Sequence, residues 1–501
     1  MKRGLLLGID IGTTGAKAVL VDGSGAVAAE AVTPYPMQTP RPGWTEQNPD
    51  DWWQSCVVSI RALLDEAGVD GTAVDAVGLS GQMHGLVLVD AAGTSLRPCI
   101  MWNDQRTAGQ CAQIEHRVGR DRLIAVTGKP ALTGFTAGKL LWVREHEPGV
   151  YERAAKMLLP KDFVRLRLTG VPGTDVADAS GTNLLDVGRR AWSDEVLELL
   201  EVAPGLMPEA AESPEVTARV SEAGAAATGL LAGTPVVAGA GDQAAQSVGT
   251  GIVDEGISSV TIGTSGVVFA ATGRCVVDPT GALHAYCHAA PGRWHLMGVT
   301  LAAGGSLRWL RDLLESDYAT MDELAAGVAA GSEGLLYLPY LSGERTPRAD
   351  PDARGVFCGL SLRHGRAHVI RSVLEGVAFS LKDCLELLCS LKVECGRVRV
   401  SGGGAGSALW RQVMADVFDL ELVLVNVTQG AAFGAALLAG VGAGVFADVD
   451  SACRRAVRET GAVRPGPDAA AYGRFYERYR ALYPALASEF RALARTLDTP
   501  G

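Results

Sequence analysis

Asp10 interrupts an apolar run at residues 5–11, and the Gly-Thr-Thr-Gly turn of residues 12–15 follows at once. A second apolar run comes after the turn, so the pattern predicts a β-hairpin with a short loop. Such a loop directs backbone N–H groups and two hydroxyls towards one point, which suits phosphate oxygens. A carboxylate in an apolar strand is costly unless it faces a cation or several donors. Mg²⁺ carried by a nucleotide is the candidate cation; the alternative is an ordinary hairpin whose aspartate bonds the backbone.

A second hairpin of the same kind occupies residues 259–270, with the turn Gly-Thr-Ser-Gly at residues 263–266. Two similar hairpins half a chain apart suggest two similar domains. Each domain would offer a loop of donors to one ligand between them. A clamp on phosphate is therefore the interpretation that we favour.

A polar loop, Ser-Gly-Gln-Met-His-Gly, follows the predicted strand at residues 74–79. Open α/β sheets place ligand contacts at the carboxyl ends of their strands. Gln82 and His84 offer donors and acceptors, and Met83 offers an adaptable apolar wall, as a polyhydroxylated ligand requires. The alternative is a histidine that caps a neighbouring turn. Trp102, after a later apolar run, either stacks on a sugar face or lies in the core.

Asp242 and Gln243 follow a predicted strand at residues 235–241 that ends in Ala-Gly-Ala-Gly. Glycines at that place let the backbone approach a ligand closely. An ionised aspartate at a strand end that faces a cleft is placed to accept a proton from a bound hydroxyl. A helix N-cap is the ordinary role of an aspartate there. We interpret Asp175 and Asp178, in an earlier loop, as residues that position loops near the cleft.

The remaining pattern alternates strands and helices. We expect a third strand at residues 26–32 and a helix at residues 50–66, opened by Asn48 as cap and Pro49 as first residue. Apolar spacing predicts a long amphipathic helix at residues 367–388. Gly304-Gly305 precede a helix at residues 306–314, and a strand at residues 398–401 opens into a glycine loop and a helix. The tail from Phe446 is expected to be helical, charged and peripheral.

Length and composition exclude several classes of protein. A chain of 501 residues needs two to four domains, and 48% apolar with 20% charged residues is typical of a soluble protein. The net charge of −11 argues against nucleic-acid or anionic-membrane partners. The apolar N-terminal stretch is cut short by Asp10, so we do not interpret it as a leader. Ten cysteines without a Cys-x-x-Cys pair indicate a reducing, cytoplasmic location.

With these motifs in view, the chain resembles the FGGY family of carbohydrate kinases, and within it the members that phosphorylate D-xylulose. The motifs that carry the resemblance lie at residues 8–14, 80–85, 159–162, 239–244, 263–266, 339–347 and 401–405. The resemblance implies an α/β fold of two ribonuclease H-like (actin-like ATPase) domains with an ATP and sugar cleft between them. The implied boundaries are 1–250 for the N-terminal domain, 251–445 for the C-terminal domain and 446–501 for a helical tail packed on the latter.

The resemblance also implies roles for particular residues. Asp242 becomes the catalytic base and Asp10 a second catalytic carboxylate, with ATP and Mg²⁺ as cofactors and the metal held at both, partly through water. The implied sugar contacts are Gln82, Met83, His84, Trp102, Asp242 and Gln243. The implied nucleotide contacts are Gly12, Thr13, Thr14, Lys17, Gly263, Thr264, Ser265, Gly304, Gly305, Gly403, Gly404 and Ser407.

The implied reaction is transfer of the γ-phosphoryl group of ATP to D-xylulose, in xylose catabolism. Gln243 departs from the asparagine that many such kinases carry after the catalytic aspartate. A kinase of another ketose or a polyol is therefore an alternative, and an actin-like ATPase is an alternative from another class. A small-molecule sugar is the expected partner, with no nucleic acid and no membrane; a homodimer is one expected assembly.

Overall fold

The computed structural model describes residues 4–498 and contains two mixed β-sheets of seven strands each. The first sheet has the order β13-β14-β5-β1-β2-β3, with β15 also paired to β5. Strands β1, β2 and β3 are antiparallel, whereas β5, β14 and β15 run parallel to β1 or to one another through β5. The strands are β1 Leu5–Ile11, β2 Gly15–Asp22, β3 Val27–Pro34, β5 Val74–Gly81, β13 Val216–Arg219, β14 Pro235–Val237 and β15 Ala240–Gly241.

The second sheet repeats this plan in the order β18-β19-β17-β16-β22-β23-β24. The antiparallel hairpin of β16 and β17 corresponds to that of β1 and β2, and β22 pairs in parallel with β16 as β5 does with β1. Both predicted hairpins are thus confirmed. The strands are β16 Ile257–Ile262, β17 Gly266–Thr272, β18 His284–Cys287, β19 Trp294–Thr300, β22 Arg397–Ser401, β23 Glu421–Val425 and β24 Glu459–Val463.

Helices pack on the sheets, and within residues 4–498 five two-stranded ribbons lie outside them. In the first half of the chain the helices are α1 Pro49–Ala67, α2 Ala108–Val118, α3 Arg120–Thr127, α4 Thr136–His146, α5 Pro148–Arg153, α6 Pro160–Thr169, α7 Val176–Ala179, α8 Asp194–Leu199, α9 Glu222–Thr228 and α10 Asp242–Gly249. In the second half they are α11 Gly304–Leu313, α12 Tyr318–Ala326, α13 Arg366–Ser390, α14 Ala408–Phe418, α15 Ala431–Gly442, α16 Val449–Ala456 and α17 Ala469–Asp498.

The ribbons pair β4 Glu46–Gln47 with β7 Cys99–Ile100, β6 Val87–Val89 with β8 Lys156–Leu158, β9 Thr174–Asp175 with β12 Ala210–Ala211, β10 Leu185–Asp186 with β11 Ala191–Trp192, and β20 Leu336–Leu338 with β21 Val356–Cys358. Short 3₁₀ turns lie at Ser180–Thr182, Pro204–Leu206, Ser332–Gly334 and Gly403–Gly406. Across residues 4–498, none of the helices combines the length and apolar character that a bilayer crossing demands.

The alternation of side chains along β1 decides which way Asp10 points. Leu7 and Ile9 face the core beneath α1, whereas Leu6 faces the core on the other side of the sheet, beneath α15. Gly8 shares that second face, and a Cβ there would collide with the Ala432 carbonyl of α15. Asp10 follows two residues later on the same face, so its carboxylate lies on the side of α15.

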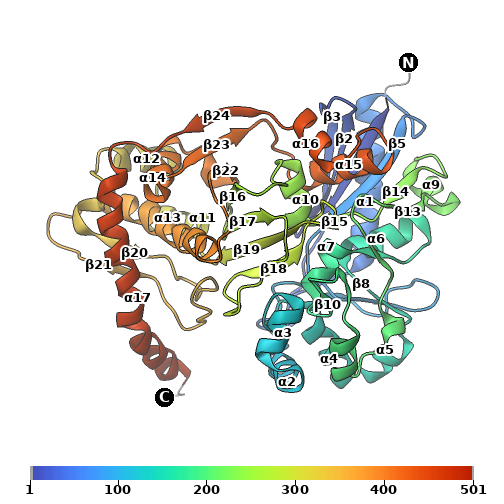
Figure 1. Cartoon of the computed structure of the whole chain (residues 1–501), viewed down its shortest axis with the longest axis horizontal. Coiled ribbons are helices and arrows are strands. Elements are labelled where there is room, and N and C mark those ends of the chain that lie inside the picture. The colour runs from blue at the N-terminus through green and yellow to red at the C-terminus, as the bar shows by residue number, and fades with distance from the viewer. Residues whose placement is uncertain (1–3, 499–501) are drawn as a thin grey trace.

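Helix α15 belongs to the end of the chain but packs on the first sheet. Figure 1 shows α15 and α16, in orange-red, beside the blue strands of that sheet. Gly434 of α15 contacts Ala245 of α10 so closely that a Cβ would overlap the Ala245 carbonyl. The two helices therefore form the packed joint between the sheets.

Two expectations differ from the structure. The strand at residues 235–241 is broken: Gly239 adopts φ 85° and packs on the Leu79 carbonyl, which separates β14 from β15. The residues after Phe446 are not a wholly helical tail on the second sheet, because β24 extends that sheet and α16 belongs to the apolar cluster that contains Val19 and Val21 of the first. Helix α17 packs on α13, α14 and β20. The physical reason is that the buried side chains of α16, from Val449 to Ala456, form an apolar face that packs into the core beside the first sheet.

Candidate active site

Asp10 lies near the carboxyl end of β1, and Asp242 directly follows β15. Strand β5 lies between these two strands. Asp10 lies opposite Ser80 of β5, and Ala240 of β15 lies opposite Ser80 from the other side. Asp242 comes two residues after Ala240, as the first residue of α10, and Gly241 is the N-cap. The N-cap role is therefore not the one that Asp242 fills. Since paired strands lie about 4.8 Å apart, the two carboxylates share one edge of the sheet within a span of two strands.

Both carboxylates are partly buried, and Asp10 has an oxygen without a hydrogen-bond partner. Oδ1 of Asp10 is buried and accepts no hydrogen bond. Burial raises the pKa of Asp10 to about 6, although the Ser80 hydroxyl and the Lys17 ammonium oppose it. Burial, followed by the charge of Asp10, raises the pKa of Asp242 to about 7, against the amides of Gln243. Such a pair suits a cation and a proton transfer near neutral pH.

The first hairpin loop turns its carbonyls away from the cleft. The Tyr35 hydroxyl donates to the Gly12 carbonyl, and the Gln47 side-chain amide donates to the Thr13 carbonyl at 2.8 Å. The backbone N–H groups of Thr13 and Thr14 have no acceptor among residues 4–498. Donors without partners, at the end of a hairpin beside Asp10, form an anion-binding loop.

The second hairpin loop is held in the same way by the start of α11. Gly304 N donates to the Gly263 carbonyl at 2.9 Å, and Ala303 N and Gly305 N both donate to the Thr264 carbonyl at 2.9 Å. A Cβ at Gly304 would lie 2.5 Å from the Gly263 carbonyl, so only glycine permits this approach. The N–H groups of Thr264 and Ser265 again have no acceptor in the described part of the chain.

A pocket of about 440 Å³ opens beside this second loop. Its lining includes Thr264, Gly304, Leu307, Tyr318, Gly403 and Ser407. Ser407 also caps α14, because its hydroxyl accepts from Trp410 N at 3.0 Å. A cavity with apolar walls and glycine backbone next to an anion-binding loop has the form of a nucleotide site.

His84 is held in a backbone conformation that is unusual for its type. Its φ is 69°, and its carbonyl accepts from Lys139 Nζ at 2.8 Å and from the Thr136 hydroxyl at 3.1 Å. Nδ1 contacts the Gly181 carbonyl at 2.8 Å. Burial, then the charge of Lys139, lowers the pKa of His84 well below its usual value. The neutral ring thus donates from Nδ1 and leaves Nε2 as an acceptor.

Gln47 links the loop of His84 with the first phosphate loop. Its side-chain oxygen accepts from Gln82 Nε2 at 2.9 Å and from Trp52 Nε1 at 3.0 Å, while its nitrogen holds Thr13. The remaining oxygen of Gln82, Oε1, is buried without a partner. Gln82 therefore serves in part as scaffold. Sequence reasoning missed Gln47, which no motif marks.

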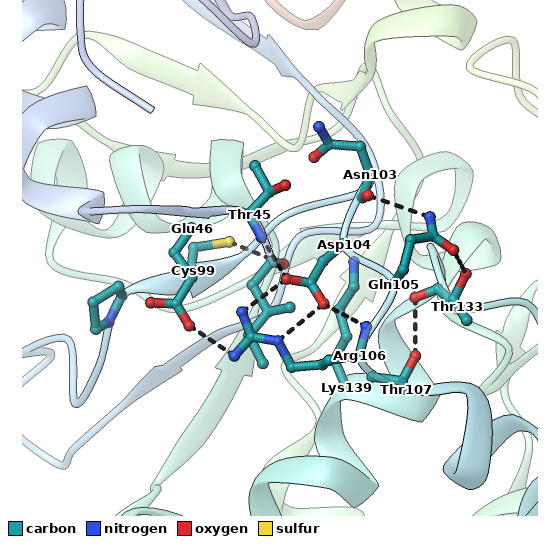
Figure 2. A network of polar contacts seen from close by, with 12 residues as sticks. Thr45, Glu46, Cys99, Asn103, Asp104, Gln105, Arg106, Thr107, Thr133 and Lys139 are labelled. Atoms are coloured by element: carbon teal, nitrogen blue, oxygen red, sulfur yellow. Dashed lines mark hydrogen bonds and ion pairs between the residues drawn. The ribbon is translucent and has the colours of Figure 1, made fainter. Parts of the chain in front are cut away.

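Trp102 lies at the surface and not in the core, since the residue is 40% exposed. Its Nε1 donates to the Thr13 hydroxyl at 3.2 Å. Figure 2 shows the polar network that follows it: Arg106 pairs with Asp104 at 2.7 Å and with Glu46 at 2.8 Å. This network fixes the loop that carries Trp102.

A buried charge cluster supports the backbone before Asp242. Lys161 Nζ lies 2.7 Å from Asp175 Oδ2 and 3.9 Å from Asp178 Oδ2. Burial opposes the charge of Lys161, but these carboxylates and Asp162 outweigh it and raise its pKa. A Cβ at Gly241 would lie 3.0 Å from Asp178 Oδ1, so the cluster packs directly behind the site. This placement agrees with the positioning role expected for both aspartates.

Three expected site residues, Lys17, Gln243 and Met83, have other residues of the protein as neighbours. Lys17 is the cross-strand partner of Asp10, but its ammonium lies 3.4 Å from Glu30. Gln243 lines a narrow cavity between α10 and the second sheet, where Gln246 donates to Thr261 at 3.3 Å. Met83 instead packs with Tyr286 and Met297 of the second sheet.

The comparisons with known proteins agree with this geometry. The N-terminal domain model of the FGGY family of carbohydrate kinases matches residues 5–249, and the C-terminal domain model matches residues 258–443. Xylulose kinase from Escherichia coli (strain K12) is 42% identical over 88% of the chain and 90% of that protein. Xylulose kinase from Bacillus subtilis (strain 168) is 38% identical over 95% and 96%. A solved structure described as a xyloylose kinase from Brucella ovis is 39% identical, covers 97% of the chain and 99% of its own, and has a TM-score of 0.91.

Proposed function

The chain belongs to the FGGY family of carbohydrate kinases, and from that premise we propose that it transfers the γ-phosphoryl group of ATP to D-xylulose, giving D-xylulose 5-phosphate. The enzyme is an ATP-dependent sugar kinase. Support for D-xylulose comes from the relatives that bear that activity in their names and from the Gln82–His84 loop, which presents an uncharged polar lining.

In this proposal Asp242 is the general base. Its carboxylate accepts the proton of the terminal hydroxyl while that oxygen bonds to the γ-phosphorus and the bond to the ADP oxygen breaks. A pKa of about 7 matches a base that works near neutral pH. Asp242 also begins α10, whose Gln246 contacts Thr261 just before the second phosphate loop, so the base and that loop are tied together.

Mg²⁺ is the metal that the family implies. Asp10, with its unpartnered buried oxygen, would hold it, and Asp242 would contribute partly through water. Residues 4–498 contain no cluster of three or more His, Cys, Asp or Glu that would cage a metal, which agrees with an ion that nucleotide phosphates and water mainly coordinate. The ion would neutralise charge on the phosphates.

The two hairpin loops bind the phosphates in this scheme. Their N–H groups and the hydroxyls of Thr13, Thr14, Thr264 and Ser265 surround the phosphate path, with Gly12 and Gly263 at the turns. Gly304, Gly305, Gly403, Gly404 and Ser407 belong to the walls or support of the adenosine pocket. Lys17 acts on Asp10 through its charge. Phosphoryl transfer needs such positioning more than covalent help.

His84, Met83, Gln82 and Trp102 bind the sugar, with Gln243 beside the base. A cytoplasmic location and a homodimer complete the proposal. Ten free cysteines, seven of them buried, are compatible with a reducing compartment.

The observation that carries the proposal is the pair of partly buried carboxylates, Asp10 with an unpartnered oxygen and Asp242 with a raised pKa, beside two loops of free N–H donors. ADP release is measured with D-xylulose, D-ribulose, D-fructose, D-gluconate and glycerol. D-xylulose should give the highest kcat/KM. A higher value for another acceptor would reject D-xylulose, and ATP hydrolysis that is equally fast without any acceptor would reject the sugar site.

A further inference from the structure

The loop before Arg345 is fastened to the end of β19. The Glu344 carboxylate accepts from the Thr300 hydroxyl at 3.0 Å and from Leu301 N at 2.9 Å, and Arg345 N donates to it at 2.7 Å. Burial raises the pKa of Glu344 to about 7. The side chain of Glu344 thus points towards the end of β19, and its carboxylate accepts all of these hydrogen bonds there.

The residue after Arg345 is fastened to the same place. Thr346 N donates to the Val299 carbonyl at 2.9 Å, and the Thr346 hydroxyl accepts from Val299 N at 3.0 Å and donates to the Ala282 carbonyl at 3.0 Å. Because both neighbours are tied to the sheet end, the backbone of Arg345 is held on either side and its side chain is free to leave that surface.

The guanidinium of Arg345 has no hydrogen bond or ion pair with any residue in the range 4–498, although the side chain is partly buried. Arg348, three residues on, has such partners: it lies 3.4 Å from Asp383 and 4.8 Å from the centre of the Tyr483 ring. Burial lowers the pKa of Arg345. A partly buried arginine without an acceptor is costly, so its acceptor is expected to be a ligand.

The sheet end that holds Arg345 faces the loop of His84. Val299 packs against the cluster formed by Met83, Tyr286 and Met297. The ring centres of His84 and Tyr286 lie 6.4 Å apart, and the Tyr286 hydroxyl is buried without a partner. A cation and a hydroxyl, both without partners, thus meet the sugar loop from the second sheet.

We propose that Arg345 binds the sugar from the side of the second sheet, donating its N–H groups to acceptor oxygens opposite His84, with the Tyr286 hydroxyl beside it. The inference rests on the proposed function in so far as the acceptor is a sugar at His84. Acceptor binding then requires residues of both sheets, so a sugar is fully recognised only when the two are together.

The test replaces Arg345 by methionine, which keeps the length of the side chain and removes its charge and donors. Hydrogen bonds from a charged donor are strong enough to predict a rise of about 10- to 100-fold in the KM for D-xylulose. The KM for ATP should change less than about twofold, since the nucleotide pocket does not include Arg345. The unfolding temperature of the sugar-free enzyme should stay the same or rise, because an unpaired, partly buried charge is lost.

Arg348→Met is the matched control: it removes an arginine whose partners are structural, so it should lower the unfolding temperature and leave the KM for D-xylulose unchanged. Arg345→Lys retains the charge without the planar fork and should give an intermediate KM. Tyr286→Phe should raise the same KM by a smaller factor.

A KM for D-xylulose within twofold of wild type in Arg345→Met, equal shifts for sugar and ATP, or a marked loss of stability would each overturn the proposal. If the methionine variant does not fold, Arg345→Lys is the test: its KM for D-xylulose should rise while its KM for ATP stays unchanged. If the wild type prefers another sugar, the proposed function fails while the split measured with that sugar still decides the role of Arg345. If it accepts none, both fail.

Discussion

The residues of the site are arranged for ligand binding at a cost in stability. Asp10 and Asp242 are two partly buried carboxylates whose pKa values burial raises; the charge of Asp10 raises that of Asp242 further, and Oδ1 of Asp10 has no hydrogen-bond partner. In a protein selected only for stability, apolar or amide side chains would replace them. Their presence together at one sheet edge is the residue-level sign of function.

Asp242→Asn should lower kcat by about two to four orders of magnitude, because an amide cannot accept the proton. The dissociation constant for ATP should stay within a few-fold of wild type, and the unfolding temperature of the ligand-free enzyme should rise. Kinetics, nucleotide titration and calorimetry check the three outcomes. Substantial sugar-dependent turnover in this variant would reject Asp242 as the base.

Lys139 offers a pH test of the support beneath His84. Burial lowers its pKa from 10.5 to about 7 in the folded protein. Between these values the unfolded chain binds more protons, so the contribution of Lys139 to the free energy of unfolding increases as the pH rises from 7 towards 10.5. The free energy of unfolding of the wild type minus that of Lys139→Met should therefore increase by up to about 1.4 kcal/mol per pH unit.

Urea unfolding at pH 7, 8 and 9 measures this slope. The exposed Lys392, replaced by methionine, controls for the substitution itself. A difference between wild type and Lys139→Met that stays constant over this range would mean that folded Lys139 keeps its proton throughout, and it would contradict the lowered pKa.

At the scale of elements, the joint between α10 and α15 depends on small residues. Gly434→Ala would force a Cβ into the Ala245 carbonyl, whereas Gly473→Ala in α17 meets no atom within 4 Å. Overpacking against rigid backbone costs about 1–3 kcal/mol. Gly473→Ala, in an open helix position, should instead stabilise by about 0.5–1 kcal/mol.

Denaturant unfolding of the two alanine variants gives the comparison. Because α10 begins at Asp242, Gly434→Ala should also lower kcat, and Gly473→Ala should leave it unchanged. Equal stability of the two variants would show that the joint yields without cost.

At the scale of the whole molecule, the chain crosses between its two halves. Gly8 of β1 and Gly78 of β5 are both covered by α15, which arrives from residue 431 onward. The domain boundaries expected near residues 250 and 445 therefore do not divide the molecule into two separate hydrophobic cores. The division into domains 1–250 and 251–445 with a tail 446–501 stays a proposal.

A fragment of residues 1–250 should not fold alone, since it would expose the apolar face that α15 and α16 cover. Circular dichroism and size-exclusion chromatography should report aggregation or an unfolded chain. Addition of a second fragment, residues 251–501, in co-expression should restore a soluble complex. A compact, cooperatively unfolding monomer of residues 1–250 would contradict the prediction.

Local patterns in the sequence determined the hairpins, the helix at residues 50–66, found at Pro49–Ala67, and the helix at residues 367–388, found at Arg366–Ser390. They succeeded because alternation, caps and helical spacing act between residues that are neighbours in the chain. The family motifs, together with the family match, established the reaction class. The broken strand at Gly239 and the strand β24 escaped, because each depends on contact with a distant segment.

The tertiary structure alone decided which polar groups meet and which stay unpaired. Gln47 ties Gln82 to Thr13, and Lys139 holds the His84 carbonyl, across 35 and 55 residues of chain respectively. The guanidinium of Arg345 is left without a partner while its neighbours bond other residues: Glu344 accepts from Thr300, and Thr346 donates to the Ala282 carbonyl. Burial and pairing are properties of three-dimensional proximity, so no spacing within the sequence could have predicted them.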